Sequence, residues 1–134
     1  MTIQDIMTPV PLTLHPDDNI TMAIERMKDN HIHHLPIIDH DNNVVGIVSQ
    51  SDLYRKALSL TKETSGVSFT SKVLFNTPVS EIMTASPTTI SSEAQVAKVA
   101  EILVASDFHA VPVIFQDRVV GIVTAKDVLE SRSE

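Results

Sequence analysis

The 134-residue sequence contains no cysteine and no tryptophan, and its other aromatic residues are one tyrosine and four phenylalanines. Without cysteine the chain can form neither a disulfide nor a thiolate metal site. Since aromatic residues are scarce, the hydrophobic content of 43% consists mainly of valine, isoleucine, leucine, methionine and alanine. This composition is typical of helix layers packed on sheets, and it favours an α/β protein that folds as one compact unit.

Positive charge is also scarce, with 10 lysines and arginines against 17 aspartates and glutamates, for a net charge of −7. Such a chain lacks the extended basic face that duplex DNA requires, so we expect no DNA partner. Charged residues and a proline interrupt the most apolar run, residues 96–115, so a membrane-spanning helix is not expected. The first residues, MTIQDIMTP, lack the basic and apolar regions of a signal peptide. We therefore expect a soluble cytoplasmic protein with no membrane partner.

Two copies of one pattern follow each other in the sequence. An offset of 76 residues carries the segment Ile-Met-Thr at 6–8 onto the same segment at 82–84, and His33 onto His109. After a one-residue deletion the offset is 75, and Val-Gly-Ile-Val at 45–48 falls on the same letters at 120–123. Chance similarity would not keep these motifs in order, so the chain contains an internal repeat.

Each copy predicts the element order β-α-β-β-α. Apolar residues at i, i+3, i+4 and i+7 predict a helix with one buried face in each copy: Ile20, Ala23, Ile24 and Met27, then Val96, Val99, Ala100 and Leu103. Pairs of apolar runs around short polar turns predict β-hairpins at 35–38 with 44–48 and at 111–115 with 119–123. A second helix is expected after each hairpin, at 51–60 and 125–131, capped by Ser49 or Thr124.

The expected organisation is one repeat at 1–60, a linker at 61–76 and a second repeat at 77–134. Repeats of this size are small to be stable alone, so we expect them to pack through their sheets. The linker is rich in serine, threonine and lysine, with a short helical piece expected at 72–75. Its apolar residues either pack on the outside of the pair or form a lid or dimer contact.

The segments HIHHLPIIDHDNNVVGIVSQSDL and DFHAVPVIFQDRVVGIVTAKDV, each preceded by Ile-Met-Thr, resemble CBS (cystathionine beta-synthase) domains over residues 3–60 and 77–130. The resemblance implies a tandem pair, or Bateman module, with pseudo-two-fold symmetry and two clefts between the repeats. Such pairs are regulatory sensors without catalytic activity, and they require no cofactor. The resemblance also implies AMP, ADP or ATP as the ligand, with S-adenosylmethionine or NAD as secondary candidates. It further implies a homodimer and an unidentified effector protein as partner.

The resemblance also assigns a ribose contact to the motif Ser/Thr-x-x-Asp, which here is Ser49 with Asp52 and Thr124 with Asp127. A carboxylate can accept a hydrogen bond from each hydroxyl of a ribose diol. The same residue types at the same spacing also form a capping box at a helix start, so a purely structural role is the alternative.

The adenine is expected near Thr13 and Leu14 in copy one and near Thr89 and Ile90 in copy two, for which core packing is the alternative. The phosphate contacts of the family match a group of histidines: His31, His33 and His34 in copy one and His109 in copy two. Lys126 is a candidate for permanent positive charge, with an ordinary solvated position as the alternative.

Only copy one carries three histidines, whereas copy two has Asp107 and Ala110 in the matching segment, so the two clefts are expected to differ. Because histidine titrates near pH 6.5, affinity for an anionic nucleotide is expected to weaken from about pH 6 to about pH 8. Surface or strand-end histidines that bind no ligand are the main alternative. A metal site at the histidines is a weak alternative, since no cysteine or spaced acidic ligand completes it.

Two other functions are alternatives to ligand sensing. A scaffold protein with empty clefts is compatible with the acidic surface and the charged linker. An enzyme is disfavoured, because the sequence has no Gly-rich phosphate loop and no serine or cysteine nucleophile motif.

Overall fold

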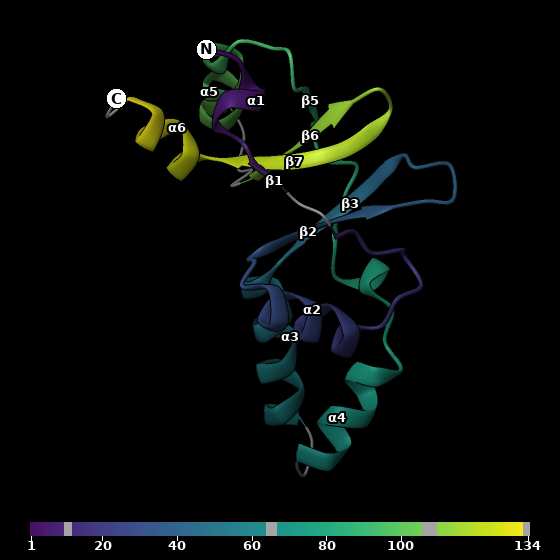
Figure 1. Ribbon diagram of the computed structural model, residues 1–134. Coiled ribbons are helices and arrows are strands. Elements are labelled where there is room, and N and C mark those ends of the chain that lie inside the picture. The colour runs from purple at the N-terminus through teal and green to yellow at the C-terminus, as the bar shows by residue number, and fades with distance from the viewer. Residues whose placement is uncertain (10–11, 64–66, 106–109, 133–134) are drawn as a thin grey trace.

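The computed structural model describes residues 1–9, 12–63, 67–105 and 110–132 and consists of two sheets with helices on their outer sides (Figure 1). The first repeat contributes α2 (Ile20–Asn30), β2 (His34–Ile38), β3 (Val44–Ser49) and α3 (Gln50–Glu63). The second repeat contributes β5 (Ile90–Ser91), α5 (Val96–Ala105), β6 (Ala110–Phe115), β7 (Arg118–Thr124) and α6 (Ala125–Arg132). The predicted α/β class and the helix, hairpin, helix order of each repeat are confirmed.

A short strand near the start of each repeat crosses to the sheet of the other repeat. β1 (Thr8–Pro9) pairs antiparallel with β7, and β4 (Thr84–Ala85) pairs antiparallel with β3. The strand orders are therefore β1-β7-β6-β5 in one sheet and β2-β3-β4 in the other. Each sheet thus contains main chain from both halves of the sequence, an exchange that the order of the repeats did not predict.

A short helix before each crossing strand anchors the exchange with a buried apolar side chain. In α1 (Ile3–Ile6), Ile3 is fully buried in the core of the second repeat. In the 3-10 helix η1 (Val79–Glu81), Val79 is fully buried in the core of the first repeat, and its N–H donates to the Asp18 carbonyl at 2.7 Å. The division at 1–60, 61–76 and 77–134 follows the repeats in sequence, whereas in space residues 3–9 and 79–85 lie with the opposite repeat.

Glycine is required in the strand that each crossing segment covers. A Cβ built on Gly121 would lie 2.7 Å from Sδ of Met7 and 2.9 Å from the carbonyl oxygen of Thr8. A Cβ built on Gly46 would collide with the Met83 side chain. The glycine of each Val-Gly-Ile-Val motif therefore allows the close approach of the other repeat's leading segment.

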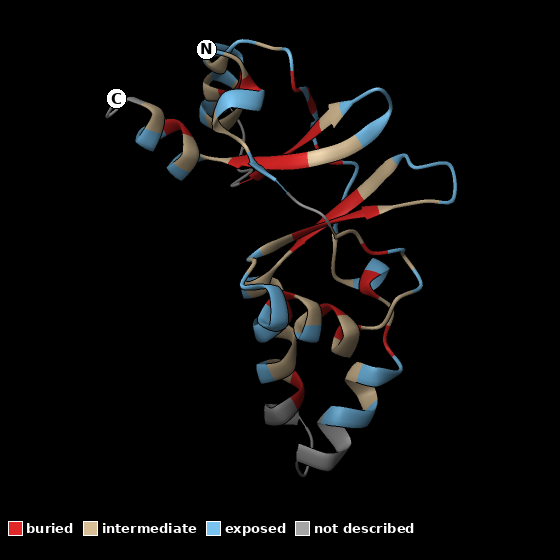
Figure 2. Ribbon diagram, in the orientation of Figure 1, coloured by how far each residue is buried: buried red, intermediate tan, exposed pale blue. Residues whose placement is uncertain are grey.

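One apolar core lies between each sheet and its helices, as the buried segments in Figure 2 show. Residues of the helix stripes predicted from the sequence, among them Ile20, Ala23, Met27 and Val99, are buried there. A third cluster of Ile47, Ala110 and Ile122 joins the inner faces of the two sheets. Packing of the repeats sheet to sheet is thus confirmed.

Residues 67–75 of the expected linker form a further helix, α4 (Val67–Phe75), which packs against α2 and α3. Leu74 is half-buried and contacts the core of the first repeat, whereas Phe75 remains 62% exposed. The chain between the repeats therefore packs on the first repeat in part and exposes an aromatic side chain at its end.

Candidate functional site

A cleft of about 530 Å³ opens where the two repeats meet. Its lining comes from β1, from the turn between α2 and β2, and from the junction of β7 with α6: Thr8, His31, Ile32, His33, His34, Ile122, Thr124, Ala125, Lys126, Asp127 and Glu130. The volume lies in the range of small-molecule sites, roughly 300 to 1,000 Å³. The structure thus brings the histidine run of copy one to the Thr-x-x-Asp motif of copy two.

The histidine run follows a left-handed turn at the end of α2. His31 has φ 53° and ψ 41°, and the N–H of Ile32 donates to the Met27 carbonyl at 3.0 Å. This hydrogen bond closes the helix in the manner of a Schellman cap, where glycine is usual and histidine is tolerated. The turn redirects the chain into β2, which places His33 and His34 at the mouth of the cleft.

His33 is held by Gln50, the first residue of α3. Nδ1 of His33 lies 2.9 Å from Oε1 of Gln50, and the Gln50 N–H donates to the His33 carbonyl at 2.9 Å. The amide nitrogen Nε2 of Gln50 in turn donates to the Tyr54 hydroxyl at 3.4 Å. The ring of one cleft histidine is therefore oriented by both main-chain and side-chain contacts.

Thr124 and Asp127 form a capping box at the start of α6. The Thr124 N–H donates to Oδ2 of Asp127 at 2.9 Å, and the Asp127 N–H donates to Oγ1 of Thr124 at 3.3 Å. The other carboxylate oxygen, Oδ1, accepts a hydrogen bond from Oγ1 of Thr8 at 3.2 Å. Since a carboxylate oxygen has two lone pairs, capping leaves Asp127 with acceptor capacity toward the cleft.

The corresponding pair of copy one, Ser49 and Asp52, forms the same capping box with different surroundings. The Ser49 N–H donates to Oδ2 of Asp52 at 3.3 Å, and the Asp52 N–H donates to Oγ of Ser49 at 3.1 Å. Oδ1 of Asp52 pairs with the Arg55 guanidinium at 3.4 Å. Asp52 and Arg55 line a smaller hollow of about 320 Å³, together with Lys56, Ser59 and Ile82, whereas Ser49 is not part of its lining. His109, the histidine expected in copy two, lies outside the described residues.

The four residues expected near the adenine lie away from the 530 Å³ cleft. Leu14 and Ile90 are buried in the two cores, where Ile90 pairs in parallel with Val113 of β6. The Thr13 carbonyl accepts a hydrogen bond from the Arg26 guanidinium at 3.0 Å. Thr89 borders two open hollows of about 350 and 480 Å³ beside the hairpin turns. Leu14 and Ile90 thus pack in the cores, and Ile90 also borders the larger of the two hollows. The expected contact of these four residues with adenine stays a prediction.

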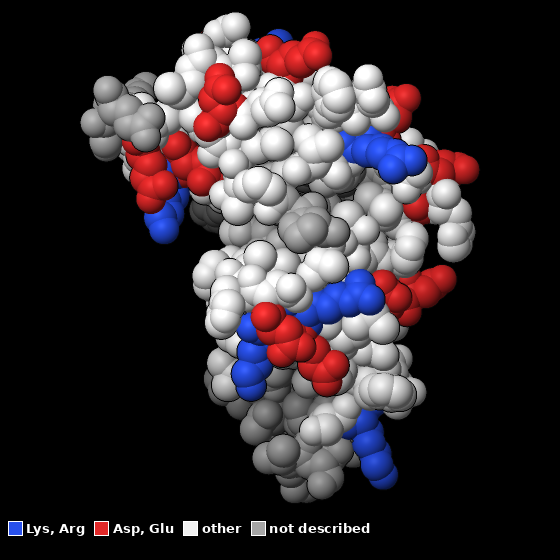
Figure 3. Space-filling model, in the orientation of Figure 1, with Lys and Arg blue, Asp and Glu red and all other residues white. Residues whose placement is uncertain are grey.

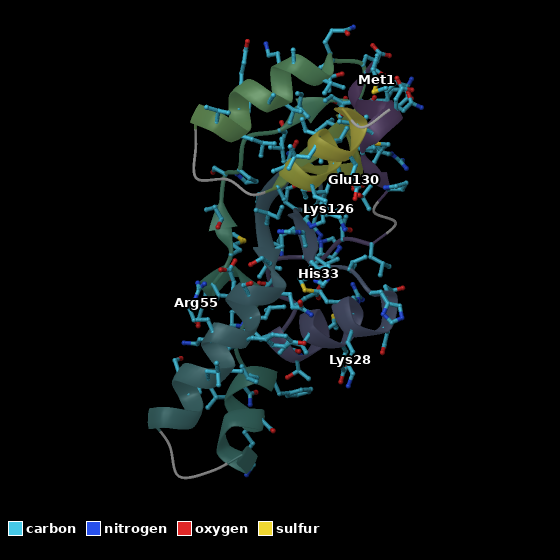
Figure 4. The ribbon with its side chains drawn as sticks, turned by 90° about the vertical axis from the view of Figure 1, so that its left-hand side faces the viewer. Met1, Lys28, His33, Arg55, Lys126 and Glu130 are labelled. Atoms are coloured by element: carbon cyan, nitrogen blue, oxygen red, sulfur yellow. The ribbon has the colours of Figure 1, made fainter. Side chains whose placement is uncertain are left out.

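The cleft also contains residues that the sequence did not single out as site residues, notably Thr8, Ile32, Ile122 and Glu130. Thr8 belongs to the repeated Ile-Met-Thr segment, and this repetition is the sequence feature that could have identified it as a site residue. Figure 4 shows Lys126 and Glu130 on α6 above His33, with Arg55 farther along α3. Nζ of Lys126 lies 3.9 Å from Oε1 of Glu130, and both side chains are largely exposed.

Charged side chains of both signs are interspersed on the face shown in Figure 3, where lysines and arginines lie beside aspartates and glutamates. Within the described ranges, no group of three His, Cys, Asp or Glu side chains could hold a metal ion. The helices of the same ranges include none that is both long and apolar enough to cross a membrane.

Comparison with known proteins finds the same family in both halves. The CBS domain pattern matches residues 3–59 and 79–134. The chain is 32% identical over 127 residues to the L-aspartate semialdehyde sulfurtransferase of Methanocaldococcus jannaschii. The aligned segment makes up 94% of this chain and 22% of that protein. It also spans 31% of an uncharacterized protein of the same organism, so it corresponds to less than a third of each of these relatives.

Two solved structures share the fold over nearly the whole chain. CBSX2 of Arabidopsis thaliana, solved in complex with AMP, has a TM-score of 0.74 at 26% identity and covers 98% of this chain and 96% of its own. The CBS domain pair of protein MJ0100, solved in complex with 5′-methylthioadenosine and S-adenosyl-L-methionine, has a TM-score of 0.78 at 29% identity and covers 99% and 96%. The arrangement of sheets and helices described above is thus shared with other CBS pairs.

Proposed function

The chain belongs to the CBS domain family, with two copies in tandem, and on this premise we propose that it is a regulatory module that binds an adenosyl ligand between the copies. The observation that carries the proposal is the union of Asp127 from copy two with the histidine run of copy one in a single cleft. The proposed activity is binding, not catalysis.

The cleft offers each part of an adenosine ligand a chemically suitable surface. Oδ1 of Asp127 faces Thr8 and can accept a ribose hydroxyl with its second lone pair. Ile32 and Ile122 provide apolar walls for the adenine ring. The imidazoles of the histidine run suit an anionic group on the 5′ side when they are protonated.

AMP, ADP and ATP are the first candidate ligands, followed by S-adenosylmethionine and NAD. Two relatives of similar fold support this class, since one was solved with AMP and the other with 5′-methylthioadenosine and S-adenosyl-L-methionine. A 5′-substituted adenosine is common to these three compounds, so it is the part of the ligand on which the proposal rests.

Titration calorimetry of AMP with the wild type and an Asp127→Asn variant tests the proposal. The amide oxygen can still accept the Thr124 N–H, so the cap is retained while the charge that strengthens the ribose hydrogen bonds is lost. We expect AMP affinity to fall roughly tenfold or more. Asp41→Asn, which removes the same charge from the hairpin turn of copy one, is the matched control and should bind AMP as the wild type does.

A thermal-shift panel of AMP, ADP, ATP, S-adenosylmethionine and NAD distinguishes a sensor from a scaffold. A ligand present at about 100 times its dissociation constant should stabilise the fold by about 2.7 kcal/mol. Absence of any shift with all five compounds would contradict the proposal and favour the scaffold.

The output of the module is proposed to pass through a homodimer or an effector protein. Large apolar side chains are exposed on two helices, with Leu58 of α3 63% exposed and Leu129 of α6 64% exposed. Light scattering of Leu58→Glu and Leu129→Glu variants, with and without AMP, tests this part. Unchanged mass in both variants and in the wild type at all ligand concentrations would contradict a ligand-dependent dimer.

A further inference from the structure

The two copies carry opposite charges at one equivalent helix position, just after the aspartate of each capping box. The offset of 75 residues that carries Asp52 onto Asp127 also carries Arg55 onto Glu130. In copy one, the Arg55 guanidinium lies 3.4 Å from Oδ1 of Asp52. In copy two, the Glu130 carboxylate takes the corresponding place on α6 and lines the 530 Å³ cleft. The cleft proposed for the adenosyl ligand therefore has a negative charge where the other repeat has a positive one.

Glu130 also offsets the charge of Lys126, the permanent cation that the sequence offered for contact with an anion. Nζ of Lys126 lies 3.9 Å from Oε1 of Glu130. Figure 4 shows both residues on α6 above His33, which places them beside the histidine run. On the side of the cleft where the 5′ group of the ligand is proposed to lie, the lysine is thus accompanied by a carboxylate.

The permanent charges among the described residues that line the cleft all come from α6. They belong to Lys126, Asp127 and Glu130, whereas the turn after α2 supplies histidines, which as a class titrate near neutral pH. One cation is therefore present with two carboxylates. Each further phosphate of a ligand adds negative charge to a cleft whose permanent charge is already negative, and Coulomb repulsion opposes its binding.

We propose that Glu130 is a specificity-determining residue, which selects an adenosyl ligand with a 5′-monophosphate or an uncharged 5′ group over one with a di- or triphosphate. The selection rests on the adenosyl-binding function proposed above, with the 5′ group beside the histidine run. Repulsion between exposed charges a few ångströms apart lowers affinity roughly threefold or more for each added charge. Since ATP carries two phosphates more than AMP, the difference between these two ligands should be roughly tenfold or more.

Titration calorimetry of AMP, ATP and 5′-methylthioadenosine at about pH 8, in low salt and without divalent cations, tests the selection. Most histidines are neutral at this pH, so the permanent charges dominate. We expect the wild type to bind AMP roughly tenfold more tightly than ATP. Glu130→Gln keeps the shape of the side chain and removes its charge, so it should raise ATP affinity and narrow the preference to within about threefold. The affinity of uncharged 5′-methylthioadenosine should change less than about twofold, which shows that the variant keeps an intact site.

Equal affinity of the wild type for AMP and ATP, or the same preference in Glu130→Gln, would overturn the proposal while leaving adenosyl binding intact. Failure of all three ligands to bind the wild type would instead overturn the binding function itself.

Two further variants assign the effect to the position and the sign of the charge. Glu101→Gln removes the same charge from an exposed position of α5 that does not line the cleft, so this matched control should keep the full preference for AMP. Glu130→Arg introduces the charge that Arg55 has at the equivalent position of copy one, and it should make ATP bind more tightly than AMP. Retention of the wild-type preference in Glu130→Arg, or its loss in Glu101→Gln, would overturn the assignment.

Salt dependence distinguishes repulsion by charge from exclusion of ATP by its size. The side chains of Lys126 and Glu130 are 81% and 66% exposed, so dissolved ions screen their charges. The Debye length falls from about 30 Å at about 0.01 M salt to about 3 Å at about 1 M, and the preference for AMP should shrink several-fold over this range. A preference that stays constant with salt would show exclusion by size and would overturn selection by Glu130.

Discussion

Oγ1 of Thr8 donates a hydrogen bond to Oδ1 of Asp127 at 3.2 Å, across a separation of 119 residues in the sequence. It joins the first strand of the chain to the first turn of its last helix at the edge of the cleft. Because Thr8 lies near the start of repeat one and Asp127 lies near the end of repeat two, this side of the cleft forms only when the leading segment has crossed to the opposite sheet.

Replacing Thr8 by valine should lower AMP affinity a few-fold, because the Asp127 carboxylate loses the hydroxyl that orients it. Thr8 is exposed and its strand pairing uses main-chain atoms, so the free energy of unfolding should change by less than about 0.5 kcal/mol. Calorimetry and urea unfolding measure the two effects. Thr8→Ser keeps the hydroxyl and should bind as the wild type; equal affinity in the valine and serine variants would refute this role.

Adding a methyl group to either covered glycine should destabilise the fold, by about 1 to 3 kcal/mol for Gly121→Ala. The new Cβ meets the Thr8 carbonyl as well as the Met7 side chain, so the same substitution in a Met7→Ala background should remain costly. Gly46→Ala meets a flexible methionine side chain, so in a Met83→Ala background it should cost little. Urea unfolding of the two double-mutant cycles checks this difference, and equal rescue in both would contradict it.

Truncating Ile3 should cost about 2 to 5 kcal/mol although it is the third residue of the chain, because its side chain is fully buried. The neighbouring Gln4→Ala replaces an exposed side chain in the same short helix and should change the free energy of unfolding by less than about 0.5 kcal/mol. Equal stability of the Ile3→Ala and Gln4→Ala proteins in urea would show that the leading segment does not anchor the second repeat.

The hairpin turn of copy one should contribute stability that disappears in acid. Hydrogen bonds from the Asn43 and Asp41 N–H groups, led by Asn43, hold the pKa of Asp39 below its ordinary value. Since the pKa is lower in the folded chain than in the unfolded one, the contribution is complete above the unfolded value of about 3.9 and is lost as the pH falls through the folded value. NMR titration should show a depressed Asp39 pKa, and Asp39→Asn should reduce the loss of stability between about pH 5 and about pH 2. An Asp39 carboxyl that titrates at or above its ordinary value would contradict this account.

The sequence by itself determined the features that depend on local patterns. The apolar stripe from Ile20 to Met27 predicts a buried helix face, and the hydroxyl-x-x-Asp motifs predict caps at the starts of α3 and α6. Both hairpins follow from paired apolar runs around polar turns, as β6 and β7 show. Internal similarity then establishes two copies of the same fold, whose sheets must pack because each copy is small.

Only the tertiary structure decided which parts of the two copies meet. Both copies carry the same Ile-Met-Thr and Val-Gly-Ile-Val motifs, so pairing within a copy and pairing between copies leave the same signal in the sequence. Burial of Ile3 in one core and Val79 in the other accompanies the exchange, and Leu14 and Ile90 are also buried in the two cores. The cleft that brings His33 near Asp127 forms through hydrogen bonding and apolar burial between residues that are distant in sequence. Hydrophobic periodicity describes only neighbouring residues, so it cannot predict which distant segments meet.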